Sequence, residues 1–219
     1  MIKLLIYDLD GTLIDSLGDI SASINWMLKE LKFPALPEKQ IGSFVGKGVH
    51  NLVRNVLREG SPKKEEPGEK LIERAVQLYR SRYQDHLLDE TQLFPSVLEV
   101  LEHFKSKKQA VITNKPGDFS VQILRALKVE SYFFRVIGGE VAKKPSPEPV
   151  LELMRLAGAC PSEAVLIGDS DIDIQTAQNA GIKVIAVTHG FSKREELKTP
   201  RPDFLVDGFY ELIRCPLLQ

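Results

Sequence analysis

The sequence predicts an α/β protein: a doubly wound, mostly parallel sheet that carries a small all-helical domain. Three observations support this fold class, namely short apolar runs typical of buried strands, amphipathic stretches of helical period between them, and one long segment without a convincing strand. The composition agrees, because 219 residues with 43% hydrophobic and 27% charged side chains are enough to bury an ordinary core.

The predicted sheet starts close to the first residue. Residues 3–7 form an apolar run that stops at Asp8, as expected for a strand buried on both faces. The same pattern recurs at 109–113, 164–168 and 183–187, and more weakly at 134–137 and 203–206. Amphipathic stretches predict helices between these strands, at 96–105, 118–127, 147–157 and 171–180. This alternation of strand and helix favours a parallel sheet covered on both faces.

Residues 16–87 break the alternation and are predicted to form a separate helical domain. Their periodicity predicts helices over 17–31, 49–57 and 69–86. We therefore expect an α/β core made of residues 1–15 and 88–219, with the helical domain 16–87 inserted after its first strand.

Charge and cysteine content narrow the possible partners. The chain has 29 Lys and Arg against 30 Asp and Glu, so no general attraction to nucleic acid or acidic lipid is expected. No apolar run approaches the roughly 20 residues that span a bilayer. Cys160 and Cys215 belong to no CxxC or Cys/His cluster and are expected to be free thiols. We expect a cytoplasmic protein that binds neither nucleic acid nor membranes.

Polar side chains follow several predicted strands, where ligands of open parallel sheets bind. Asp8 and Asp10 come first, and their spacing in extended chain puts both carboxyl groups on one side. Two carboxyl groups that close must hold a cation or share a proton. One can then attack phosphorus while the other donates and takes protons. The alternative is that the pair only caps a loop or helix.

A second acidic group follows the strand at 164–168. Oxygen donors without His or Cys suit a hard ion, Mg²⁺ above all, and Asp8, Asp169 and the backbone carbonyl of Asp10 are the expected ligands. Asp173 is as well suited to supporting the site as to binding the ion. Asp171 is assigned to capping the helix that follows.

Positive and donor groups for an anionic substrate lie on the same predicted edge. The Thr113 hydroxyl and the amides of the next helix N-terminus would cradle a phosphate. Lys144 would neutralise charge during phosphoryl transfer, although taken alone it is an ordinary surface residue. The pattern of residues does not decide whether Lys143 or Lys144 reaches the phosphate.

Four separated motifs resemble those of the haloacid dehalogenase superfamily of phosphotransferases, in the same order and over almost the whole chain. They are Asp8-Leu9-Asp10-Gly11-Thr12, Thr113-Asn114-Lys115, Lys144-Pro145 and Gly168-Asp169-Ser170 with Asp173. The helical insertion resembles a C1-type cap. Segments such as Val45-Gly46-Lys47-Gly48-Val49 and Leu93-Phe94-Pro95 are similar to phosphoglycolate phosphatases. Ser146 and Ser96 depart from common family residues, Ser96 from a glycine, which leaves the subfamily open.

The resemblance implies a role for each polar residue at the sheet edge. These roles are nucleophile for Asp8, general acid and base for Asp10, phosphate contact for Thr113 and secondarily Asn114, charge neutralisation for Lys144, Mg²⁺ binding for Asp8, Asp10 and Asp169, and support for Asp173. The cap would set specificity, and Lys47 between two glycines is the expected contact for a small substrate carboxylate. The alternative is that Lys47 belongs to an ordinary loop before a helix.

We therefore expect a Mg²⁺-dependent phosphomonoester hydrolase that acts through an aspartyl phosphate, with 2-phosphoglycolate as first substrate. A nucleotide, a sugar phosphate or pyrophosphate is the alternative. A dehalogenase would need neither Asp10 nor Asp169, and a hexose-phosphate mutase usually carries Glu-Asp where Gly168-Asp169 stands. A phospho-accepting signalling module would place its acidic pair on another strand and would lack a cap.

Overall fold

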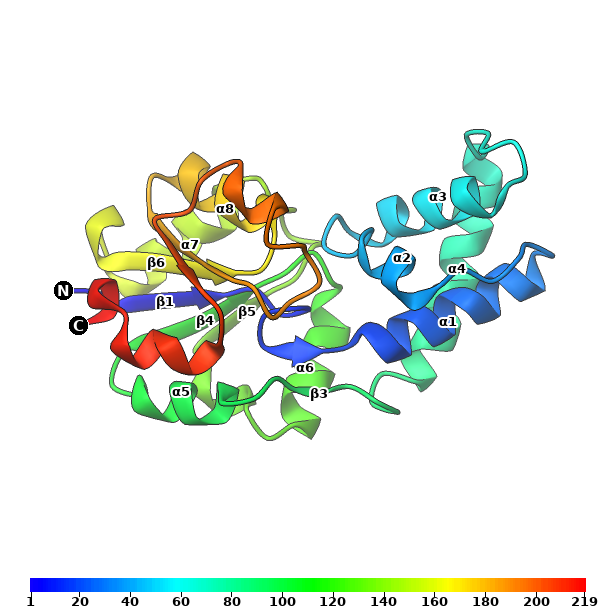
Figure 1. The fold of residues 1–219 in the computed structure, drawn as a ribbon. Coiled ribbons are helices and arrows are strands. Elements are labelled where there is room, and N and C mark those ends of the chain that lie inside the picture. The colour runs from blue at the N-terminus through cyan, green and yellow to red at the C-terminus, as the bar shows by residue number, and fades with distance from the viewer.

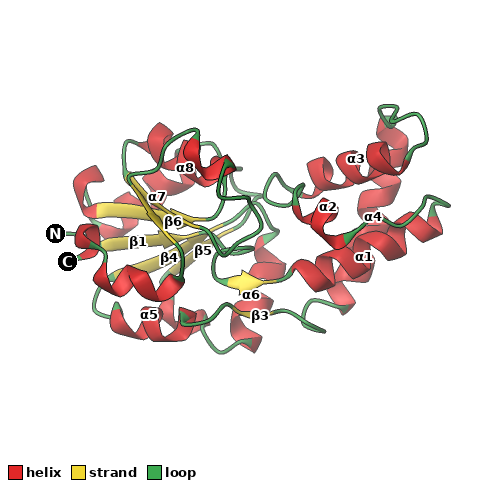
Figure 2. Cartoon of the chain, in the orientation of Figure 1, coloured by secondary structure: helices red, strands yellow, loops and turns green.

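A single parallel sheet of six strands organises the protein, whose computed structural model describes residues 1–219. The strand order is β5-β4-β1-β6-β7-β8, so the first strand lies at the centre. Their bounds are β1 Leu4–Tyr7, β4 Lys108–Ile112, β5 Arg135–Ile137, β6 Ala164–Gly168, β7 Lys183–Val187 and β8 Phe204–Val206. The predicted fold class is confirmed, and all six predicted strands are present (Figures 1 and 2).

Helices cover both faces of the sheet because its side chains alternate between two apolar layers. Leu4 and Ile6 of β1 pack with α7 (Glu148–Ala157) and α8 (Asp171–Ala180). Leu5 and Tyr7 pack on the opposite face, in the layer that contains α5 (Val97–His103), α6 (Gly117–Ala126) and the C-terminal 3₁₀ helix Phe209–Arg214. Figure 1 shows α7 and α8 on one side of the strands and α5 on the other. This two-sided burial explains why the strands are continuous apolar runs.

Four helices form a lobe beside the carboxyl ends of the strands. They are α1 (Leu17–Glu30), α2 (Glu38–Gly42), α3 (Val49–Gly60) and α4 (Glu69–Asp85), called the cap below. Helix α1 packs against the other three. The single-turn helix α2 was not predicted, because five residues are too few to show a helical period. The exact limits 16 and 87 of the cap domain stay a prediction.

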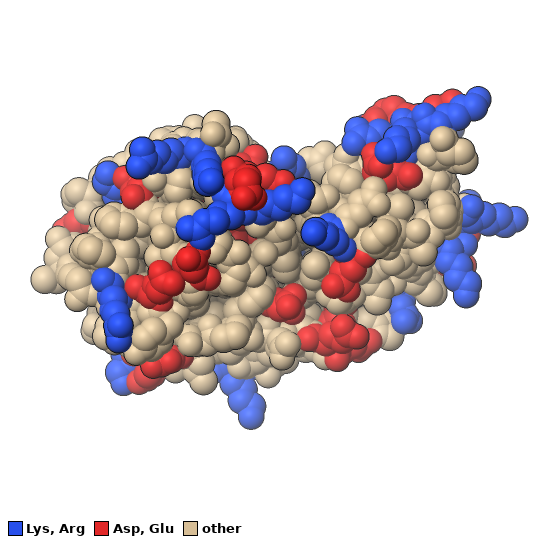
Figure 3. All heavy atoms as spheres, viewed as in Figure 1, with Lys and Arg blue, Asp and Glu red and all other residues tan.

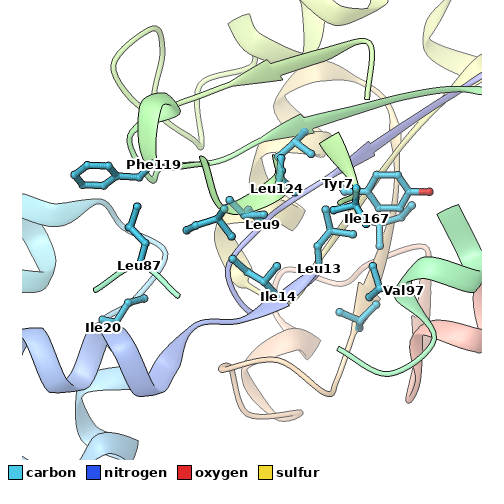
Figure 4. Close-up of a cluster of buried hydrophobic side chains, with 14 of the residues drawn as sticks. Tyr7, Leu9, Leu13, Ile14, Ile20, Leu87, Val97, Phe119, Leu124 and Ile167 are labelled. Carbon is cyan, nitrogen blue, oxygen red and sulfur yellow. The ribbon is translucent and has the colours of Figure 1, made fainter. Parts of the chain in front are cut away.

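Two linkers join the cap to the core, and they are held together. Strand β2 (Ile14–Asp15) of the first linker pairs antiparallel with β3 (Gln92–Leu93) of the second. Neither strand was predicted, since two residues carry no pattern of alternation. Ile20, Leu87 and Phe119 bury the junction beside Leu9 in the same apolar layer (Figure 4). The cap therefore connects to the core through a paired hinge.

The second linker ends in a residue with unusual backbone geometry. Ser96, which precedes α5, has φ 64° and lies in the left-handed region that favours glycine. Its side chain makes no capping hydrogen bond with the helix. Ser96 therefore stands, in place of the family's glycine, at a position where a glycine would be unstrained and a serine is strained.

Neither sign of charge dominates the face shown in Figure 3. Lys and Arg side chains are interspersed with Asp and Glu over both lobes in Figure 3, consistent with the net charge of −1. None of the helices combines the length and apolarity that a membrane crossing requires. Cys160 is exposed and Cys215 is buried, and both are free thiols, as predicted.

Candidate active site

The candidate site lies where the order of the strands reverses. From β1 the chain continues to β4 and β5 on one side, then returns to β6, β7 and β8 on the other. Asp8 follows β1, Thr113 follows β4 and Asp169 follows β6, so parallel pairing brings the three residues to one edge. This is where open α/β sheets bind ligands.

Lys144 lies between two carboxylates from different loops. Its Nζ is 2.6 Å from Oδ1 of Asp8 and 2.6 Å from Oδ1 of Asp173. All three residues are at most 5% exposed. Lys143 is exposed and borders a separate cavity next to Arg80 and Glu140. The tertiary structure therefore brings Lys144, and not Lys143, to Asp8.

Asp169 completes a group of three buried carboxylates. One oxygen from each of Asp8, Asp169 and Asp173 lies within 4.8 Å of the others. Asp169 accepts hydrogen bonds from Thr12 Oγ1 at 3.1 Å and from the Phe191 amide at 2.9 Å. Gly11 passes beside it with φ +86°, and a Cβ there would overlap the Asp169 carboxylate. A glycine is required at this close approach.

Burial sets the protonation of these groups. It raises the pKa of Asp8 well above its ordinary value, with the Asp173 charge adding to the effect. Burial and the Asp173 charge also raise the pKa of Asp169 to about 7. Burial alone would lower the pKa of Lys144, but Asp173 and Asp8 outweigh it and raise that pKa.

The charges in the cluster leave room for a divalent cation. When ionised, Asp8, Asp169 and Asp173 carry three negative charges against the single positive charge of Lys144. Buried charges need partners, and an ion of charge +2 would supply them. All donors are oxygens, which suits Mg²⁺. Asp169 and Asp173 each accept hydrogen bonds on both carboxylate oxygens, whereas Asp8 is contacted on Oδ1 only, so Asp8 has the freest oxygen for an ion.

The residue at the N-cap position of helix α8 differs from the prediction. Asp171 was assigned to capping, but Ser170 is the N-cap residue, and its hydroxyl accepts from the Asp173 amide at 3.3 Å. Asp173 in turn accepts from the Ser170 amide at 3.1 Å. The reason is the register of the turn: Asp171 is already the first helical residue. The same capping arrangement holds Asp173 toward Lys144.

Asp10 lies in a different electrostatic setting from Asp8. Its Oδ1 accepts from the Ser16 hydroxyl at 2.6 Å and from Lys115 Nζ at 2.8 Å. Lys115 also donates to the hydroxyl of Tyr83, which belongs to cap helix α4, at 2.6 Å. Asp10 is thus paired with its own cation, apart from the Asp8 cluster.

The remaining predicted contacts lie in the walls around Asp8. Thr113 is buried, and its hydroxyl accepts from the Lys115 amide at 3.1 Å. The Asn114 side chain bonds to the Lys144 amide at 2.8 Å and to the Gly46 carbonyl at 2.8 Å, so it ties the cap loop to the core. Lys47 is half exposed, with Nζ 3.9 Å from Asp171. Their roles toward phosphate and substrate stay predictions.

Two cavities meet at Asp8 and Asp10. One, of about 50 Å³ and partly open, is lined by apolar and aromatic side chains of the cap and core, including Leu52, Tyr79 and Phe119, and by polar side chains such as Arg80. The other, of about 370 Å³, is polar and reaches Lys47 and Asp169. The two aspartates therefore stand between this smaller cavity and the candidate ion site.

Sequence reasoning gave no role to several residues that hold the site. Ser16, Lys115 and Tyr83 contact Asp10 directly or through one another. Lys115 lies within the predicted motif after β4, and a cation at that sheet edge was a usable signal. The sequence carried no such signal for Tyr83, because a tyrosine on an amphipathic helix is usually a core residue.

Comparisons with known proteins agree with this geometry. A family model described as haloacid dehalogenase-like hydrolase matches residues 5–187. Phosphoglycolate phosphatase 1 of Pseudomonas aeruginosa is 34% identical over 218 residues, which cover 97% of this chain and 79% of that protein. Phosphoglycolate phosphatase of Aquifex aeolicus is 33% identical over 216 residues, with 97% and 95% covered.

A solved structure shares the whole architecture. The crystal structure of a predicted phosphoglycolate phosphatase from Haemophilus somnus aligns with a TM-score of 0.91 at 30% sequence identity. The alignment covers 97% of both chains. The aligned region therefore includes both the sheet and the cap of this chain.

Proposed function

We propose that this chain, a phosphatase that belongs to the haloacid dehalogenase-like hydrolase family, hydrolyses 2-phosphoglycolate through an aspartyl phosphate on Asp8 with the help of Mg²⁺. The observation that carries the proposal is the buried cluster in which Lys144 Nζ contacts Asp8 and Asp173 at 2.6 Å beside Asp169. Such a cluster combines a nucleophile, a fixed cation and an ion site in one buried space.

In the first step a carboxylate oxygen of Asp8 attacks phosphorus, and the bond from phosphorus to the ester oxygen breaks. Lys144 holds the Asp8 carboxylate and offers positive charge to the phosphoryl oxygens. Thr113 and the amides at the start of α6 are proposed to contact those oxygens as well. Asp10, which enters this step protonated on the oxygen that Lys115 does not contact, gives that proton to the departing oxygen, so an alcohol leaves rather than an alkoxide.

In the second step water attacks the aspartyl phosphate. Asp10, now ionised, takes a proton from the water as its oxygen bonds to phosphorus, and the Asp8 carboxylate departs. Phosphate leaves, and both aspartates return to their starting state. Asp10 can serve in both steps because it borders both cavities.

Magnesium fits the residues present, on the charge and donor arguments given above. Asp8 and Asp169 would hold the ion, with the Asp10 carbonyl as a third ligand. A bound Mg²⁺ would supply charge neutralisation for the phosphate and for the carboxylates. The raised pKa values of Asp8 and Asp169 mean that ion binding displaces protons from the site.

The substrate is proposed from the identity of the relatives and from the cations that line the two cavities. Lys47 lines the polar cavity and Arg80 the smaller one, so each cavity offers a cation to a substrate carboxylate. Relatives called phosphoglycolate phosphatase match nearly the whole chain. Lys47 on the cap loop is proposed to meet the substrate carboxylate. Arg80 of α4, which borders the smaller cavity, is the alternative contact for that carboxylate.

A panel of phosphoesters tests the substrate. We expect kcat/KM to be highest for 2-phosphoglycolate, above those for a nucleoside monophosphate, a hexose phosphate and pyrophosphate. Lys47→Ala should raise KM for 2-phosphoglycolate and leave KM unchanged for phosphate esters whose leaving group carries no charge. The control is Lys63→Ala, in the exposed loop between α3 and α4. If Arg80→Ala alone has this effect, the carboxylate contact is Arg80. Indifference to 2-phosphoglycolate would exclude it as substrate.

A further inference from the structure

The two carboxylate oxygens of Asp10 have unequal surroundings. Oδ1 accepts from Ser16 Oγ at 2.6 Å and from Lys115 Nζ at 2.8 Å. Oδ2 accepts no hydrogen bond from the protein, and the residue borders both cavities that meet at Asp8. Two donors on one oxygen fix the plane of the carboxylate and leave the other oxygen for chemistry.

Lys115 is held in turn from the cap. Its ammonium donates to the Tyr83 hydroxyl at 2.6 Å and lies 4.6 Å from the centre of the Tyr83 ring. Tyr83 is 1% exposed, stacks on Tyr79 at 5.3 Å and packs edge-on against Phe119 at 5.9 Å. A buried, rigid tyrosine of α4 thus sets the direction of a flexible lysine of the core.

We propose that Lys115 is a positioning residue that aims Oδ2 of Asp10 at the leaving-group oxygen, and that Tyr83 makes this alignment depend on the position of the cap. The inference rests on the proposed role of Asp10 in proton transfer. The proton that reaches the departing oxygen comes from Oδ2, and the proton taken from water returns to Oδ2. Lys115 itself transfers none.

The physical reason lies in the lysine stem. Four rotatable bonds separate the ammonium from the backbone, so its place is set by its hydrogen-bond partners. Tyr83 moves with α4, whereas Asp10 and Lys115 belong to the core. When the cap swings away, Lys115 loses one of two partners and its bond to Asp10 loosens. Proton transfer is then efficient only while the cap covers the site, where bulk water is excluded.

Leaving-group dependence provides the test. An alkyl phosphate needs its leaving oxygen protonated, whereas p-nitrophenyl phosphate releases p-nitrophenolate, which leaves without a proton. Because both esters form the same aspartyl phosphate, only kcat/KM, which reports its formation, depends on the leaving group. Lys115→Met should lower kcat/KM for the alkyl ester on the order of 10²-fold and kcat/KM for the aryl ester far less. Tyr83→Phe, which keeps the ring, should show the same pattern at about 5- to 10-fold.

A double-mutant cycle with Asp10→Asn separates this role from a structural one. If Lys115 acts through Asp10, adding Lys115→Met to Asp10→Asn should lower kcat/KM for the alkyl ester by a further factor of less than about three. Equal loss of kcat/KM on both esters, or additive losses in the cycle, would overturn the inference. Lys107→Met, which loses a bond to the Ile2 carbonyl, and Tyr132→Phe, which loses a bond to Glu102, are the matched controls.

The same experiment distinguishes failure of the proposed function. If the unaltered protein hydrolyses neither ester, or Asp10→Asn shows no dependence on the leaving group, the proposed chemistry itself is wrong. If both behave as proposed while Lys115→Met and Tyr83→Phe match their controls, only the positioning role falls. Thermal unfolding of each variant checks that it is folded, and Tyr83→Phe provides the test if Lys115→Met is not.

Discussion

The carboxylate of Asp19, in the first turn of α1, accepts hydrogen bonds from the amide of Thr91 at 2.9 Å and from its hydroxyl at 2.6 Å. The Glu90 amide donates to the same carboxylate at 2.9 Å. These contacts join the first turn of α1 to the second linker, next to the β2–β3 pair. The Asp19 carboxylate therefore ties the start of the cap to the chain that returns from it.

Asp19→Ala should lower the free energy of unfolding by about 1–3 kcal/mol, because it leaves the amide and hydroxyl of the buried Thr91 and the amide of Glu90 without their acceptor. Thr91→Val, which removes only the hydroxyl donor, should cost less. Urea unfolding followed by circular dichroism measures both. The control is Asp85→Ala on exposed α4 surface. If Asp19→Ala equals this control, the carboxylate does not hold the hinge.

Asp8→Asn should abolish turnover, with a loss on the order of 10⁴-fold or more, because the amide cannot form the phosphoenzyme. The fold should survive, since the substitution removes a buried charge rather than a packing group. Steady-state hydrolysis and transfer of labelled phosphate to the protein are the measurements. Substantial turnover in this variant would show that Asp8 is not the nucleophile.

Removal of divalent ions should end hydrolysis. We expect thorough chelation to reduce turnover to background and added Mg²⁺ to restore it, while the larger and less geometry-demanding Ca²⁺ restores it poorly. Mg²⁺ should also raise the unfolding temperature of the unaltered protein, because it binds the folded state only. Asp169→Asn should weaken that rise. Full activity after chelation would contradict the ion site.

The pKa of Asp169 predicts how stability depends on pH when no ion is present. The ordinary pKa of 3.8 is raised to about 7 in the folded protein. Between these values the folded state keeps a proton that the unfolded chain has lost, so this group's contribution to the free energy of unfolding falls as pH rises from about 4 to about 7. The contribution is complete below the unfolded value and is lost above the folded one.

Urea unfolding in chelator across that range is the measurement. Asp169→Asn should flatten the decline, whereas the exposed Asp118→Asn, which removes a charge elsewhere, should leave its slope unchanged. Identical slopes for Asp169→Asn and the unaltered protein would refute the raised pKa.

Ser96→Gly should stabilise the protein by about 1 kcal/mol, because φ 64° costs a residue with a Cβ about this much and the serine makes no capping bond to offset it. Ser61→Gly is the control, since Ser61 has φ −79° and gains nothing from a glycine. A stability no higher in Ser96→Gly than in Ser61→Gly would mean that Ser96 carries no strain.

Local sequence patterns predicted most of the fold because they depend on periodicity. The strand Leu4–Tyr7 and the helix Asp171–Ala180 were predicted nearly to the residue, the helix because Gly181 ends it in left-handed geometry. Elements too short for a period, namely α2 and the β2–β3 pair, were missed. The prediction of Asp171 as the N-cap residue of α8 is wrong, because Ser170 and Asp171 are adjacent and both are common N-cap residues.

The sequence by itself determined the fold class and the acidic and basic residues at the sheet edge, because strand ends in a parallel sheet must meet. The family resemblance favoured Lys144 where the residue pattern alone left Lys143 open, and the tertiary structure showed the contact itself: Lys144 is buried against Asp8, whereas Lys143 is exposed. Only the tertiary structure decided that Lys115 and Tyr83 bear on Asp10. That contact joins residues from the cap and the core, and its geometry follows from the packing of the two lobes.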